Sequence, residues 1–123
     1  MADKPSSGKK LTTVVNRVGA RIIATPDGAI TRENCQDLPA ALADALTARG
    51  THIILDCHAV PLMDSAALET LLEMHERAEA NGCSLRIAAP SEVCRDILLA
   101  TRLQNVLRVY DDLRQAAGAG VRA

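Results

Sequence analysis

A short and fully apolar run in the middle of the chain constrains the fold more than any other feature. Ile53, Ile54 and Leu55 follow one another without the polar alternation of a strand that has one face in water. Such a run is typical of a central strand in a parallel sheet, because helices cover both faces of a sheet of that kind. We therefore expect an α/β fold in which residues 51–56 form a buried central strand that ends at Asp56.

Segments of strand type and helix type alternate along the rest of the chain. β-Branched and apolar residues predict further strands over 11–15, 21–25, 85–89 and 106–109. Apolar residues at helical spacing predict helices with buried faces from Leu38 to Leu46, from Leu68 to Ala78 and from Val93 to Leu98, and a terminal helical segment through Ala116. The order β-β-α-β-α-β-α-β-α indicates a mixed, largely parallel five-stranded β-sheet packed with about four helices.

Pro39 leaves the start of the first helix open. Proline is tolerated in the first turn of a helix, but in the interior it kinks or breaks the helix. Either the regular helix begins near Asp37, with Pro39 in its first turn, or an earlier helical turn is kinked at Pro39.

The length of 123 residues suits one domain, and no repeat or internal linker divides the chain. We place this domain at residues 11–116. Residues 1–10 are rich in Lys, Ser, Gly and Pro, and we expect them to form a disordered N-terminal tail. Residues 117–123 are expected to form a flexible C-terminal tail.

The composition argues against several classes of function. The chain has 14 Lys and Arg against 15 Asp and Glu, a net charge of −1, without the basic patch that a nucleic-acid backbone requires. Tyr110 is its single aromatic residue, so nucleic-acid bases would have no stacking platform. Apolar runs are too short to cross a bilayer, and the N-terminal residues lack the apolar stretch of a secretory signal. We expect a cytoplasmic protein with no membrane insertion and no nucleic-acid partner.

The four cysteines are expected to be reduced and to pack as small, buried hydrophobic residues. Cys35, Cys57, Cys83 and Cys94 form no CxxC pair, and no histidine lies at zinc-finger spacing from them. A glycine-rich phosphate loop is also missing from the sequence. We therefore expect no metal site and no cofactor.

Asp64 and Ser65 open the helix that follows the central strand and its loop. The first turn of a helix has free amide groups and the positive end of the helix dipole, which both favour negative charge. A phosphate on Ser65 would be tolerated there, although Asp-Ser is also a common capping pair that needs no modification. Just before the helix, Leu62 and Met63 provide either an apolar contact for a partner or core packing, and we expect one of the two to be core.

An enzyme would need an acid, a base and a nucleophile that converge on one point. Asp56, His58, Asp64 and Ser65 are the residues of this kind that lie close together in the sequence. Asp56 is better explained as a structural residue that binds loop amides. We expect no enzyme activity and no catalytic residues, with His58 lining the surface near Ser65.

A longer pattern surrounds Asp64 and Ser65. In Ile53-Ile-Leu-Asp-Cys-His-Ala-Val-Pro-Leu-Met-Asp-Ser-Ala-Ala-Leu68, an apolar strand ends in Asp, a short loop follows, and Asp-Ser opens a helix. Further along lie Asn81-Gly-Cys-Ser-Leu-Arg-Ile87 and Leu103-Gln-Asn-Val-Leu107. Together, over nearly all of 11–116, these segments resemble a STAS domain, the fold of anti-sigma factor antagonists. The chain departs from the family pattern at Ala66, where a second Ser or Thr is common, and at Ala67 and Arg102, where Gly is usual.

The resemblance implies a protein-binding module of the anti-sigma factor antagonist kind. A partner serine protein kinase, itself an anti-sigma factor, would phosphorylate Ser65 and thereby release the antagonist. The resemblance also implies a partner-binding surface, and we expect the chain to act as a monomer or weak dimer. The candidate partner-binding residues are Asp64, Met63, Ala66, Ala67 and His58.

An alternative is a constitutive adaptor. Stand-alone STAS domains also resemble subunits of ABC lipid-transport systems or of chemosensory complexes. Ala67 favours this alternative, because its methyl group stands where a partner's backbone would otherwise approach the start of the helix closely.

Overall fold

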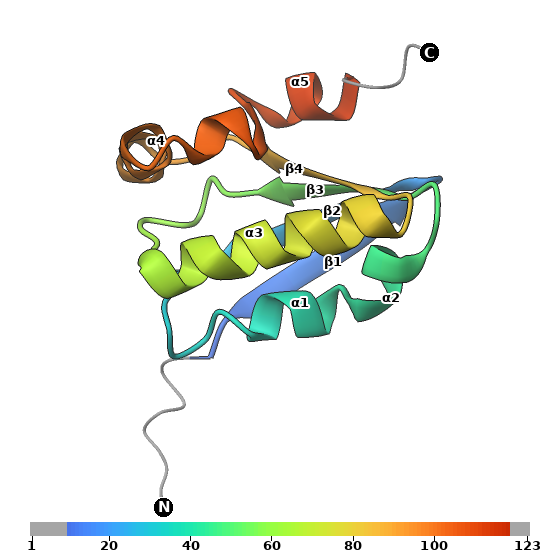
Figure 1. Cartoon of the computed structure of the whole chain (residues 1–123), viewed down its shortest axis with the longest axis horizontal. Helices are drawn as coiled ribbons and strands as arrows, with labels where there is room; N and C mark the ends of the chain where they lie inside the picture. Colours follow the sequence, from blue (N-terminus) through green and yellow to red (C-terminus); the bar gives the residue numbers. More distant parts are fainter. Residues whose placement is uncertain (1–9, 119–123) are drawn as a thin grey trace, which may run out of the picture.

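One sheet of five strands, in the spatial order β1-β2-β3-β4-β5, forms the centre of the molecule (Figure 1). The computed structural model describes residues 10–118. β1 pairs with β2 in antiparallel fashion and every other neighbouring pair is parallel, which confirms the mixed, largely parallel sheet expected from the sequence. The strands are β1 (Thr12–Val18), β2 (Arg21–Asp27), β3 (His52–Asp56), β4 (Ser84–Ala88) and β5 (Arg108–Tyr110).

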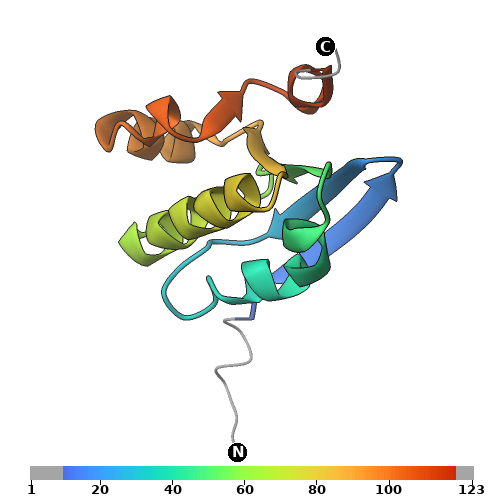
Figure 2. The same cartoon turned by 45° about the vertical axis from the view of Figure 1, so that its right-hand side comes forward.

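Helices cover both faces of this sheet unequally (Figures 1 and 2). Buried residues of α1 to α4 share the main core with Ile53 and Leu55 of β3. α5 packs on the opposite face, where Ala116 joins Ile54 and Ala88 in a smaller cluster. The helices are α1 (Asp37–Ala41), α2 (Ala43–Thr47), α3 (Ser65–Ala80), α4 (Glu92–Ala100) and α5 (Leu113–Gly118), with a 3₁₀ turn, η2 (Leu103–Asn105), before β5.

The apolar run of β3 is buried as the sequence predicts, since Ile53, Ile54 and Leu55 are all 0% exposed. Successive side chains of a strand point to opposite faces. Ile54 therefore faces α5, while Ile53 and Leu55 face the main core. β3 is continuous in its apolar character because both of its faces are covered.

The first predicted helix is in fact two short ones. α1 begins at Asp37 with Pro39 in its first turn, which is the first of the two alternatives left open by the sequence. At Leu42 the backbone leaves the helical region, with φ −115° and ψ 16°, and its amide donates to the carbonyl of Pro39, three residues back. The chain therefore has five helices within residues 10–118, where about four were expected.

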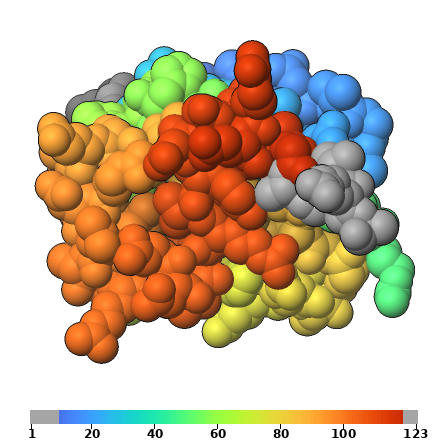
Figure 3. Space-filling view, turned by 90° about the horizontal axis from the view of Figure 1, so that it is seen from above, coloured from blue at the N-terminus to red at the C-terminus, as the bar shows by residue number. Residues whose placement is uncertain are grey.

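The β1–β2 hairpin is longer than predicted and is less covered than the rest of the sheet. Seen from above (Figure 3), α4 and α5 cover one end of the molecule while part of the blue hairpin stays in view. Val14 and Val18 of β1 are 55% and 59% exposed. Pro26 is tolerated in β2 because it lies past Ala24, the last residue of β2 that pairs with β3.

The two tails predicted from the sequence lie mostly beyond the described residues. Most of the tail expected at 1–10 lies outside them, as do residues 119–123 of the C-terminal tail. Ala117 and Gly118, which were expected to belong to that tail, form the end of α5.

The cysteines are all buried and free, as expected for small hydrophobic residues. Among the described residues, no helix is both long enough and apolar enough to cross a membrane.

A pair of leucines tests how strongly the main core stabilises the fold. Leu71 of α3 is 0% exposed and belongs to the main core, whereas Leu99 of α4 is 49% exposed. We expect Leu71→Ala to lower the free energy of unfolding by roughly 2 to 5 kcal/mol, because it leaves a cavity. Leu99→Ala should change it by less than about 0.5 kcal/mol. Urea unfolding of both variants measures the difference, and equal losses would contradict the assigned core.

Candidate functional site

Two loops that are far apart in the sequence are joined by backbone hydrogen bonds at the start of α3. One loop follows β2 and the other follows β3, and they meet at the left of Figure 1. Ile30 forms a parallel bridge with Met63. The bonds are Gly28 N to Ala59 O (3.0 Å), Ile30 N to Leu62 O (3.1 Å) and Asp64 N to Ile30 O (3.2 Å). The backbone of the loop before α3 is therefore held along most of its length by the loop after β2.

Asp64 is the N-cap of α3 and also binds the second loop. Its backbone is extended, with φ −99° and ψ −177°. One carboxylate oxygen, Oδ1, accepts the amide of Ala67 at 2.9 Å, as an N-cap side chain does. The other, Oδ2, accepts the amide of Arg32 at 2.9 Å. The Ala67 amide, and then that of Arg32, lower the pKa of Asp64 below its ordinary value, because both hydrogen bonds favour the ionised carboxylate.

Ser65 is the first residue of α3, and it is exposed. Because the cap is supplied by Asp64, the hydroxyl of Ser65 is not used for capping, and it has no hydrogen-bond partner within residues 10–118. α3 is 16 residues long, so its start places the positive end of a full helix dipole beside this hydroxyl. The capping function and the exposed hydroxyl thus belong to two different residues.

Two candidate partner-binding residues are in the core instead. Met63 is 3% exposed and Ala67 is 0% exposed, so neither side chain is accessible to a partner. Met63 is turned inward by its bridge to Ile30, and Leu62 is the exposed member of the pair at 43%. The methyl group of Ala67 packs inside the domain, which removes the reason to regard it as an obstacle to a partner.

The remaining candidates lie at or near the surface. Ala66 is half-buried and packs against the main core. The side chain of His58 is 62% exposed, and its Nδ1 lies 2.9 Å from Oδ1 of Asp56. The same oxygen accepts the backbone amide of His58 at 3.2 Å, so Asp56 orders the loop after β3, as the sequence suggested. No hydrogen bond in the described part of the chain links this pair to Asp64 or Ser65.

Arg32 belongs to this site, and sequence reasoning missed it. It lies in the irregular segment between β2 and α1, where no periodicity or motif marks it. Its amide reaches Asp64 across 32 positions of sequence. Only the pairing of the two loops brings it there, and no signal in the sequence predicts that pairing.

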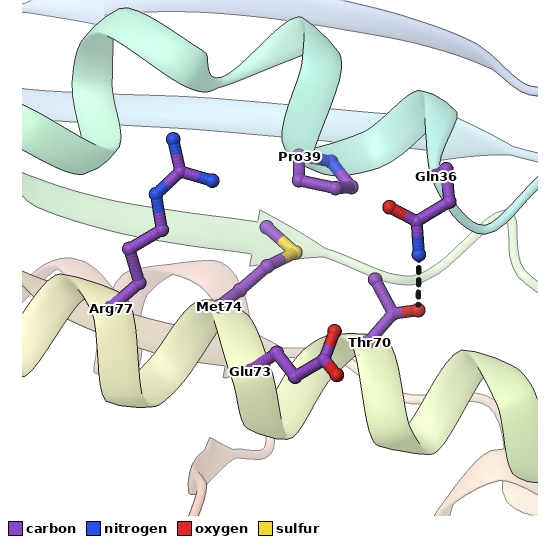
Figure 4. A pocket seen from close by; sticks show the side chains of 6 residues that line it. All are labelled: Gln36, Pro39, Thr70, Glu73, Met74 and Arg77. Carbon is purple, nitrogen blue, oxygen red and sulfur yellow. Dashed lines mark hydrogen bonds between the residues drawn. The ribbon is translucent and has the colours of Figure 1, made fainter.

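Three cavities of the described residues lie away from Ser65. The pocket between α1 and α3 measures about 80 Å³, well below the several hundred Å³ of a usual ligand site. Figure 4 shows the amide of Gln36 pointing to Thr70 across this pocket, at 3.3 Å. Two shallower hollows, of about 240 and 470 Å³, are lined by residues of 10–13 and of the loop after β2 or of α1. None of the three is lined by Asp56, His58 or Ser65.

The double role of Asp64 makes a prediction about stability and pH. Asp64→Ala removes the cap and the bond to the other loop, and we expect a loss of about 1 to 2 kcal/mol in the free energy of unfolding near pH 7. Asp64→Asn keeps only one acceptor oxygen and should lose less. Because the folded pKa of Asp64 is lowered, the advantage of wild type should be complete above the unfolded value of about 3.9 and disappear as the pH falls through the folded value. Urea unfolding at pH 7 and pH 3 checks this. A difference between wild type and Asp64→Ala that does not vary with pH would contradict it.

Comparison with known proteins gives the family. The model of the STAS domain matches residues 11–116. No curated protein sequence is significantly similar to the chain. Among solved structures, an anti-sigma factor antagonist from Mycobacterium paratuberculosis is similar, at 20% identity and a TM-score of 0.78 over 94% of this chain and 96% of that one.

Two further structures have the same fold. A candidate anti-sigma factor antagonist from Thermotoga maritima matches at 21% identity and a TM-score of 0.78, over 85% of this chain and 91% of that one. The anti-sigma factor antagonist SpoIIAA, in its unphosphorylated form, matches at 16% identity and a TM-score of 0.71, over 86% and 93% of the two chains. With the family model covering most of its length, this chain belongs to the STAS domain family.

Proposed function

We propose that this chain is an anti-sigma factor antagonist whose binding to its partner is switched by phosphorylation of Ser65. The partner is an anti-sigma factor that is also a serine protein kinase. The unmodified chain binds this partner, and phosphorylation releases it. In this proposal the chain is a binding module, and the kinase supplies the chemistry.

One observation carries the proposal: Ser65 is exposed at the first position of α3 while Asp64 occupies the cap. A hydroxyl that capped the helix would already accept a backbone amide of the first turn. The hydroxyl of Ser65 is not engaged in capping, because Asp64 accepts the amide of Ala67. The structural similarity to anti-sigma factor antagonists, one of them solved in an unphosphorylated form, supports the same function.

The helix start explains why phosphorylation would act on the partner and not on the fold. A phosphate adds about −1.5 to −2 charges, which the positive end of the α3 dipole favours. A partner docked over Ser65 would have to accommodate the same charge in its interface. If the mismatch costs roughly 3 kcal/mol, affinity falls about a hundredfold.

Two exposed side chains of the loop before α3 are suited to such an interface. Leu62 places an apolar side chain, 43% exposed, just before α3. His58 adds an exposed ring that Asp56 orients through Nδ1. We therefore assign partner contact to Leu62, His58 and Ser65, in place of the buried Met63 and Ala67.

The kinase step is tested with the cognate kinase and ATP. We expect intact-mass spectrometry to show one added phosphate, and peptide mapping to place it on Ser65. Ser65→Ala should abolish it. Ser91→Ala is the matched control, because Ser91 also stands at a helix start but accepts the Cys94 amide at 3.2 Å as the cap of α4. Labelling that persists in Ser65→Ala would refute the assignment.

The switch itself is tested by binding. Calorimetry with the anti-sigma factor should give similar affinities for wild type and Ser65→Ala, and an affinity about a hundredfold lower for the chain phosphorylated on Ser65. An unchanged affinity after phosphorylation would contradict switching. It would favour a constitutive adaptor, for which a pull-down would recover a transport ATPase subunit or a chemoreceptor-linked protein.

A further inference from the structure

We propose that Arg32 binds the phosphoryl group of phosphorylated Ser65, as a counter-charge supplied by the same chain. The inference rests on the proposed function, in which Ser65 is the phosphorylated residue. It adds a phosphate-binding residue from a different loop, 33 positions earlier in the sequence.

The first argument is position. The amide of Arg32 donates to Oδ2 of Asp64 at 2.9 Å, so the backbone at residue 32 lies directly against the residue that precedes Ser65. The bridge between Ile30 and Met63 holds the same two segments together two residues earlier. Arg32 is therefore attached to the start of α3 through its backbone, and its side chain is free to move over the adjoining surface.

The second argument is the unused guanidinium. Arg32 is exposed, and within residues 10–118 its side chain makes no ion pair or hydrogen bond. It lies within electrostatic range of Asp64. Both oxygens of Asp64 already accept backbone amides, so the guanidinium is not needed to satisfy that carboxylate. A guanidinium binds a phosphate through two parallel hydrogen bonds, and Arg32 has its donors available.

The third argument is the charge around Ser65. Asp64 precedes it, and Glu69 is exposed four residues later on the same side of α3. Glu33 is adjacent to Arg32. A phosphate on Ser65 would therefore follow the carboxylate of Asp64 directly and lie on the same side of α3 as Glu69, with the helix dipole as a partial positive charge. Arg32 provides a full positive charge next to Asp64.

The test uses the full chain with phosphoserine inserted at position 65 during synthesis, so that it does not depend on a kinase. The second ionisation of a phosphoserine has a pKa of about 6 and can be followed by ³¹P NMR. We expect Arg32→Gln to raise this pKa by about half a unit, as the loss of one positive charge a few ångströms away at the surface should. Arg32→Lys should restore part of the shift, because it keeps the charge but not the planar pair of donors.

The matched control is Arg114→Gln, which removes the same charge from the exposed face of α5 and should leave the phosphoserine pKa unchanged. A second measurement is geometric: the side-chain Nε–H signal of Arg32 should move on phosphorylation, while that of Arg114 stays in place. If Arg32→Gln and Arg114→Gln give the same phosphoserine pKa, and the Arg32 signal does not move, the proposal is overturned.

The outcomes separate this inference from the proposed function. Failure of the kinase to label Ser65 would refute the phosphorylation switch, while a shift in the phosphoserine chain would still establish the phosphate-binding role of Arg32. Labelling of Ser65 without any effect of Arg32→Gln would support the switch and refute the role of Arg32.

Discussion

The site depends on the two hydrogen bonds that the carboxylate of Asp64 accepts. Its two oxygens bind two amides from different parts of the chain, Ala67 in α3 and Arg32 in the loop after β2. A single side chain thus begins the helix and fixes the neighbouring loop against it. Serine or asparagine could cap the helix, but neither has two acceptor oxygens to bind both amides at once. Aspartate is therefore the residue best suited to this position.

Because Asp64 caps α3, the side chain of Ser65 has no capping function at the start of the helix. Its hydroxyl lies at the positively polarised end of a long helix, on the surface and outside the three cavities described above. Such a site is suited to accepting charge from outside and poorly suited to binding a small molecule, which needs a concave pocket. In the proposed function the chemistry of the site is therefore electrostatic, and it acts on the partner that docks over Ser65.

The sheet topology explains why the loops after β2 and β3 can bind each other. The carboxyl ends of β2 and β3 lie side by side in a parallel pair, so the loops that leave them start from the same edge. Backbone hydrogen bonds then continue the contact beyond the strands, from Gly28 to Asp64. Ile53 and Leu55 of β3 anchor this part of the sheet in the main core. Ligand sites commonly occur at this edge of α/β sheets.

The sequence by itself determined the features that depend on local order. A continuous apolar run predicts the doubly covered β3, and Asp-Ser after a loop predicts the start of α3. Both depend on which residue types follow one another in the chain. Only the tertiary structure decided that Met63 faces inward and Leu62 outward, and that Arg32 reaches Asp64. These facts arise from the pairing of two irregular loops. That pairing follows from how the strands place their ends in space, and no local pattern of residues records it.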